Sequence, residues 1–159
     1  MNWSQSPCRV GDVAIAGTFR VSPSELASFH QAQARGAQLG HPGAPPVGLH
    51  SPVSAGGEVP AAHLVARSVR ELCASSLVRG YRVEVGHIGR PRVLTTAVVG
   101  EPITTVATVR FRSGRGRTSH VTFSVELRRA SGGILARYDV GLDLHRPPSE
   151  SAERDLAAA

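Results

Sequence analysis

The sequence lacks the residues on which several classes of protein depend. It has no lysine, only two cysteines, and 4% aromatic residues among its 159 positions. Two cysteines, Cys8 near a mobile N-terminus and Cys73, make a structural disulfide or a zinc site improbable. No apolar run is long enough for a membrane span, and the first residues do not resemble a secretion signal. We therefore expect a cytoplasmic protein with no membrane partner and no cofactor.

The charge is the next informative feature. All 18 basic residues are arginine, against 12 acidic residues, and the formal net charge is +6. Such a charge suits nucleic acid, or the phosphates of coenzyme A or a carrier protein. The arginines are spread along the chain, however, and the one dense basic run, 110–117, contains glycines typical of a hairpin tip. We expect no nucleic-acid partner.

One long amphipathic helix is predicted over residues 59–80. Pro60 suits a first turn and Gly80 a stop. The small and apolar face comprises Ala62, Val65, Val69, Leu72, Cys73, Ser76 and Leu77, and the polar face comprises Arg67, Arg70, Glu71 and Ser75. An apolar face on one side only indicates that the helix packs against a partner.

A strand and a short helix are predicted ahead of the long helix. Alternation over residues 12–21 is typical of a half-buried strand. Its inward side chains would be Val13, Ile15, Phe19 and Val21. Ser22 and Glu25 then have the spacing of a capping box, which predicts a helix from Pro23 to about residue 35. Residues 36–58 are rich in glycine and proline, so a long loop that is either functional or disordered should follow.

Strand-like segments follow the long helix, and no comparable second helix does. They cover residues 81–85, 90–99, 103–111, 119–128 and 134–144. The last three form a meander with glycine-containing turns. The pattern predicts an α+β fold, an antiparallel sheet wrapped around one long central helix. We expect a single domain at 10–146, between a flexible N-terminus at 1–9 and a flexible tail at 147–159.

Four short motifs occur in an order that is familiar from one protein family. They are Gly11-Asp12, the run Val21-Ser22-Pro23-Ser24-Glu25-Leu26 with Phe29, the helix start Val59-Pro60-Ala61-Ala62-His63, and Arg92 eight residues ahead of Gly100-Glu101. Together with the element order they resemble the hotdog fold, and in detail its MaoC-like dehydratase and hydratase branch. The resemblance covers about residues 10–146. It implies a homodimer that hydrates or dehydrates a β-hydroxyacyl or enoyl thioester of coenzyme A or an acyl carrier protein, with the active site at the interface.

The catalytic motif of that family is degenerate here. Family members place an aspartate, and five residues later a histidine, in the loop before the long helix, but this loop has no aspartate. His41 has the family spacing, with Gly36 at the aspartate position. His50 has the better local context, with Pro45 at the aspartate position. Both histidines are candidates for a general base, because an unperturbed imidazole titrates near neutral pH.

Glu58 is the only acid in the loop and is the third catalytic candidate. It could replace the missing aspartate, or activate water as the carboxylate of hotdog thioesterases does. A favourable interaction with the N-terminus of the long helix explains it equally well.

Substrate binding is assigned to the helix start and to arginines. Free backbone amides near His63 and Leu64 could hold the thioester oxygen, and the His63 side chain is expected to cap the helix or to support the catalytic residues. Arg92, Arg110 and Arg112 suit the phosphates of coenzyme A or of a phosphopantetheine arm, although surface solubility explains them equally well.

Three functions remain open at this point. Hydration or dehydration of a β-hydroxyacyl or enoyl thioester is the leading hypothesis. The second is a hotdog acyl thioesterase, and the third is a non-catalytic hotdog subunit that binds acyl chains. One fold carries many functions, so the fold does not choose among them.

Overall fold

The computed structural model describes residues 8–38 and 57–147. Its elements, in chain order, are β1 (Val13–Phe19), α1 (Pro23–Gln38), β2 (Glu58–Val59), α2 (Ala61–Ala74), a 3-10 turn (Ser76–Val78), β3 (Arg82–Ile88), β4 (Arg92–Val93), β5 (Ala97–Val98), β6 (Ile103–Arg115), β7 (Thr118–Arg129) and β8 (Ile134–His145). His41, His50 and most of the predicted loop lie outside the described residues. Neither described helix is long and apolar enough to cross a membrane.

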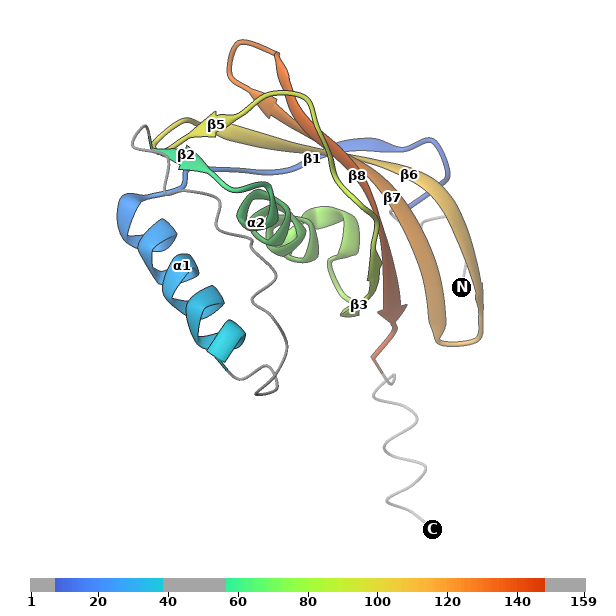
Figure 1. Ribbon diagram of the computed structural model, residues 1–159. Coiled ribbons are helices and arrows are strands. Elements are labelled where there is room, and N and C mark those ends of the chain that lie inside the picture. The colour runs from blue at the N-terminus through green and yellow to red at the C-terminus, as the bar shows by residue number, and fades with distance from the viewer. Residues whose placement is uncertain (1–7, 39–56, 148–159) are drawn as a thin grey trace.

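The main sheet is antiparallel and curls around α2 (Figure 1). Its strand order is β1-β6-β7-β8-β3, and β4 pairs with β8 on the same side as β3, while β2 and β5 form a separate two-stranded sheet. Helix α1 lies outside the hollow of the sheet, beside α2. The predicted α+β architecture, a sheet wrapped around one central helix, is confirmed.

The centre of the sheet follows the predicted alternation. On β7, every second residue from Val121 to Leu127 is fully buried on the side that faces α2. Every second residue of β8, from Ala136 to Leu144, is likewise buried on this side, with Tyr138 4% exposed. We call this the inner face, and the side turned to solvent the outer face. Asp139 lies exposed on the outer face, as the alternation requires.

Helix α2 is shorter than predicted at both ends. Val59 belongs to β2 and pairs with Ala97, so the helix begins only after Pro60. At the other end, the Ser75 hydroxyl donates to the Leu72 carbonyl at 2.7 Å and the chain turns into the 3-10 segment. Because the helical period stops there, Ser75 is buried and Ser76 is exposed, the reverse of the predicted faces.

A β-bulge in β1 overturns the predicted inward residues. Ile15 pairs with Val106 and Gly17 with Thr105, so Ala16 is an extra residue without a partner. An extra residue reverses the facing of everything before it. Val13 and Ile15 are therefore 63% and 67% exposed, whereas Phe19, beyond the bulge, is buried as predicted.

The segment 90–99 is not one strand. Arg92–Val93 pairs with β8 and Ala97–Val98 pairs with β2, with a turn between them. The chain leaves the main sheet after Thr95, since the amides of Leu94 and Thr95 both donate to the Leu135 carbonyl, at 2.8 and 3.2 Å. Two different partner strands therefore divide a run that the sequence pattern treats as continuous.

Candidate functional site

The start of α2 is held by the short β2-β5 sheet. Glu58 pairs with Val98, and the Val99 amide donates to the Gly57 carbonyl at 2.8 Å. Glu58 is exposed, two residues before the helix cap at Pro60. The structure thus places this predicted catalytic acid beside the start of the helix.

The backbone amides at this helix start differ from the prediction. Those of His63 and Leu64 both donate to the Pro60 carbonyl, at 3.0 and 3.1 Å, so they are not free to bind a thioester oxygen. The amides of Ala61 and Ala62 precede the first intrahelical hydrogen bond. They are the groups that this helix end can offer to an oxyanion.

His63 lies between the two helices rather than capping one of them. Pro60 caps α2 without a side-chain hydrogen bond, and His63 Nε2 lies 3.4 Å from the Glu25 carboxylate on α1. The His63 side chain is 10% exposed, and its ring meets the Phe29 ring edge-on, at 4.8 Å between centroids. The capping-box prediction is confirmed for the Ser22 hydroxyl, which accepts from the Glu25 amide at 3.1 Å, but the Glu25 carboxylate turns to His63 instead.

A charged row continues from this pair along α2. Arg67 lies 3.8 Å from Glu25 and 3.3 Å from Glu71, and its guanidinium stands over the Phe19 ring. Glu71 packs against β1, where a Cβ added at Gly17 would come within 2.7 Å of its carboxylate. The charged row couples α1, α2 and β1. Apart from the Arg67–Glu71 pair, which is four residues apart on α2, its contacts join residues far apart in the sequence, so no local motif indicated them.

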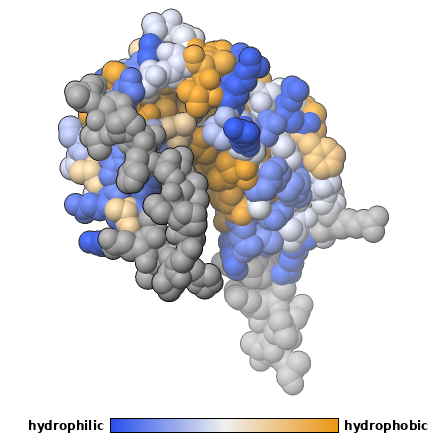
Figure 2. Space-filling view, in the orientation of Figure 1, coloured by the Kyte–Doolittle hydropathy of each residue, from blue (hydrophilic) through white to orange (hydrophobic). Residues whose placement is uncertain are grey.

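The edge of the sheet formed by β3 and β4 carries half-exposed apolar side chains. Val85, Ile88 and Val93 pair with Leu142, Val140 and Ala136, all of which are buried on the inner face. Paired residues share a face, so these three form one row on the inner face, which we call the edge row. They are 46%, 46% and 50% exposed. Figure 2 shows apolar surface in a hollow at the front of the molecule, on the side where Figure 1 draws β3 and β4 along the edge of the sheet.

A buried polar pair fixes α2 over the sheet near the edge row. The Ser68 hydroxyl donates to the Val65 carbonyl at 2.9 Å, so the Tyr138 hydroxyl supplies the proton of the 2.7 Å bond between the two side chains. Burial raises the pKa of Tyr138 to about 12, although the bond to Ser68 opposes the shift. Tyr138 therefore remains a neutral donor and acts as a structural link between β8 and α2.

The structure separates Arg92 and Arg110, two of the three arginines predicted to bind phosphate. Arg92 pairs with the exposed Arg137, so it lies on the outer face, opposite to the edge row. Arg110 lies at a bulge of β6, with β7 and β8 between it and β4. The distance from β6 to β4 is therefore three strand spacings, or roughly 14 Å. A single phosphate group would not contact both side chains across that distance.

Comparison with known proteins identifies the class of fold. No protein-family model matches the chain, and no curated protein sequence does. Among solved structures, it is similar to a MaoC-like dehydratase from Rhodospirillum rubrum, with a TM-score of 0.63, 17% identity, and coverage of 91% of this chain and 98% of the other. An (R)-hydratase from Pseudomonas aeruginosa gives 0.61 at 13% identity, with coverage of 87% and 83%. A hypothetical thioesterase from Streptococcus pneumoniae, solved with coenzyme A, gives 0.51 at 11%, with coverage of 86% and 89%.

The chain therefore has the hotdog fold. Both hydratases and thioesterases occur among its structural neighbours, so the fold agrees with the resemblance seen in the sequence.

Proposed function

We propose that the protein binds an acyl thioester at the start of α2 and catalyses the reversible hydration or dehydration of its β-hydroxyacyl or enoyl group, in the cytoplasm. The observation that carries the proposal is the edge row, a strip of apolar surface on the inner face of a hotdog sheet. From Val93 on β4 the chain runs on to β5, and β5 is hydrogen-bonded to the strand that leads into α2. An acyl chain on this strip would bring its thioester to the helix start.

The proposed chemistry needs three groups. A base removes the proton next to the thioester carbonyl, an acid protonates the departing hydroxyl, and amide donors stabilise the charge on the thioester oxygen. The amides of Ala61 and Ala62 suit the third role. His50 or His41 remains proposed as the base, and Glu58 as the acid. His63 with Glu25 is proposed to position α1, and with it the loop that follows α1.

A homodimer is proposed through the edge of β3 and β4. Strand β3 ends the sheet of the described residues, so its outer backbone groups have no neighbouring strand there. A second copy paired at this edge would extend the sheet and bury both edge rows. The thioester would derive from coenzyme A or an acyl carrier protein, and Arg92 on β4 is the arginine nearest in sequence to the edge row.

Mass spectrometry of the protein incubated with β-hydroxyacyl, enoyl and saturated acyl thioesters tests the proposal. We expect the thioester to gain or lose the mass of one water, and either His41→Ala or His50→Ala to abolish the change. His30→Ala is the matched control, because His30 lies on α1 and has no proposed role.

Two outcomes would contradict hydration. Release of free thiol, abolished by Glu58→Gln, would establish a thioesterase instead. Binding of acyl thioesters without turnover across the panel would establish a non-catalytic subunit.

A further inference from the structure

A cavity of about 520 Å³ lies at the opposite end of α2 from the proposed thioester site. It is open to solvent and bordered by the β6-β7 hairpin and the segment before β1, and its lining residues are Cys8, Arg9, Val10, Arg112, Ser113, Gly114, Gly116 and Ser119. The Cys8 thiol donates to the Leu77 carbonyl, which follows the C-terminus of α2. The 14 residues of α2 span about 21 Å, so the two sites are separate.

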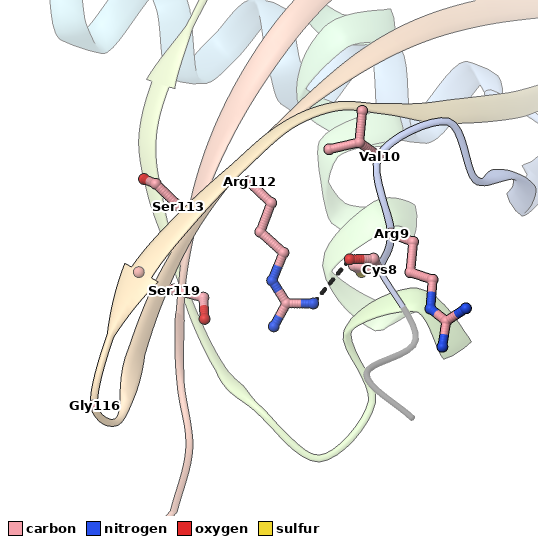
Figure 3. Close-up of a pocket in the computed structure, with 8 residues that line it drawn as sticks. Cys8, Arg9, Val10, Arg112, Ser113, Gly116 and Ser119 are labelled. Atoms are coloured by element: carbon pink, nitrogen blue, oxygen red, sulfur yellow. Dashed lines mark hydrogen bonds between the residues drawn. The ribbon is translucent and has the colours of Figure 1, made fainter. Parts of the chain in front are cut away.

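The Arg112 side chain is held in the wall of this cavity. It belongs to the inner face, because its partner on β7 is the buried Val121. Its Nη1 donates to the Cys8 carbonyl at 2.8 Å, and the Cys8 side chain is in turn fixed by Leu77. Figure 3 shows Arg112 reaching from β6 toward Cys8, with Ser119 on one side and Arg9 beyond Cys8. The guanidinium is therefore half-buried and oriented before any ligand arrives.

The charge and the shape of the lining favour an anion. Two arginines, Arg9 and Arg112, are among the lining residues, and none of the described lining residues is acidic. Asp12 is close by, but it does not line the cavity, and its carboxylate accepts the Arg9 amide at 2.8 Å. A Cβ on Gly114 would meet the Thr118 carbonyl oxygen at 2.6 Å, so the two strands of the hairpin approach closely here and leave no room for a side chain. Backbone amides, a hydroxyl and a planar guanidinium are the groups that bind phosphate oxygens.

We propose that this cavity is a binding site for a phosphate-bearing small molecule, distinct from the thioester site. Arg112 contacts the phosphate, the Ser119 hydroxyl donates to it, and Arg9 adds positive charge. The cavity volume falls in the range of small-molecule sites, so it has room for more than the phosphate group alone.

The test is a titration of the full chain with inorganic phosphate and, separately, with adenosine monophosphate. Binding is monitored through the chemical shifts of the backbone amide NMR signals. We expect saturable shifts at Gly114, Gly116 and Ser119, and none at Ala61 and Ala62. Tighter binding of the nucleotide than of phosphate would identify a nucleotide-like ligand. Equal binding would identify a site for the phosphate group itself.

Variants of the lining residues decide whether the phosphate binds in this cavity. Arg112→Gln should weaken binding at least about tenfold, and Ser119→Ala by about three- to tenfold. Arg117→Gln is the matched control, because Arg117 is exposed on the same hairpin and does not line the cavity; it should change binding less than about twofold.

Should Arg112→Gln fail to fold, Arg9→Gln and Ser119→Ala give the same test. The proposal is overturned by shifts that do not saturate, or by an equal effect of Arg112→Gln and Arg117→Gln, which would mean attraction by the overall charge only.

Discussion

The two halves of the inner face have similar side chains in very different surroundings. At the centre of the sheet, Val121, Phe123 and Val125 are covered by α2 and are completely buried. At the edge, Val85, Ile88 and Val93 are about half exposed. From the alternation of apolar residues alone, both halves resemble a buried core. Only the position of α2 distinguishes the covered half from the exposed half. The centre stabilises the fold, whereas the edge is the surface that we propose binds an acyl chain and a second copy.

The largest expected effect is at the centre. Phe123→Ala should lower the free energy of unfolding by about 3–5 kcal/mol, because it removes a fully buried aromatic side chain and leaves a cavity. Urea unfolding of the full chain measures it. Ile88→Ala, the matched change at the edge row, should cost less than about 1 kcal/mol in dilute protein. Equal losses would mean that the edge row is as buried in solution as the centre.

The next effect concerns the buried Tyr138. The pKa of Tyr138 in the folded state, raised to about 12, exceeds the ordinary value of 10. The contribution of the neutral hydroxyl to the free energy of unfolding is therefore fully present below pH 10 and is lost as the pH rises to about 12. The loss should reach roughly 2–3 kcal/mol. The free energy of unfolding, measured at several pH values between 10 and 12, tests this. In the Tyr138→Phe variant, the free energy of unfolding should depend less on pH over the same range. An unchanged slope in the variant would assign the loss to other groups.

A smaller change is expected at the proposed dimer interface. Ile88→Arg places a charge in the edge row, and we expect the dissociation constant of the dimer to rise at least about tenfold. Sedimentation equilibrium measures it. Ile15→Arg is the control, because Ile15 is exposed on the outer face at the opposite edge of the sheet. Dissociation by Ile15→Arg alone would move the interface to β1.

The smallest effect is expected on the outer face. Hydrogen bonds from Arg128, supported by the charge of Arg137, hold the pKa of Glu126 below its ordinary value of 4.5. The ionised Glu126 carboxylate therefore contributes to the free energy of unfolding above pH 4.5, and this contribution is lost as the pH falls below that value. Glu126→Gln should cost less than about 1 kcal/mol at neutral pH, because the ion pairs are partly solvated. A cost above 2 kcal/mol, measured by urea unfolding, would show that the outer face contributes as much as a core contact.

The candidate site was only partly predictable. The sequence indicated the start of α2, and Glu58 lies there. The sequence did not indicate the contact of His63 with Glu25, because 38 positions separate the two residues. Each residue also had a local role that explained it, Glu25 in the capping box and His63 at the start of the long helix. The roles of His41 and His50 stay predictions, since both lie outside the described residues. Arg112 was considered only as a possible phosphate ligand, and its place in a cavity depends on Cys8, which was expected at a mobile end but is buried.

The sequence by itself determined the elements whose pattern is local. The alternation on β7 and β8 and the capped start of α1 follow from side-chain periodicity and from hydrogen bonds between near neighbours. Only the tertiary structure decided which faces are covered. The bulge at Ala16 and the early end of α2 depend on partners elsewhere in the chain, as does the division of 90–99 between two strands. The physical reason is that strand register and burial are properties of pairs of segments, whereas periodicity is a property of one.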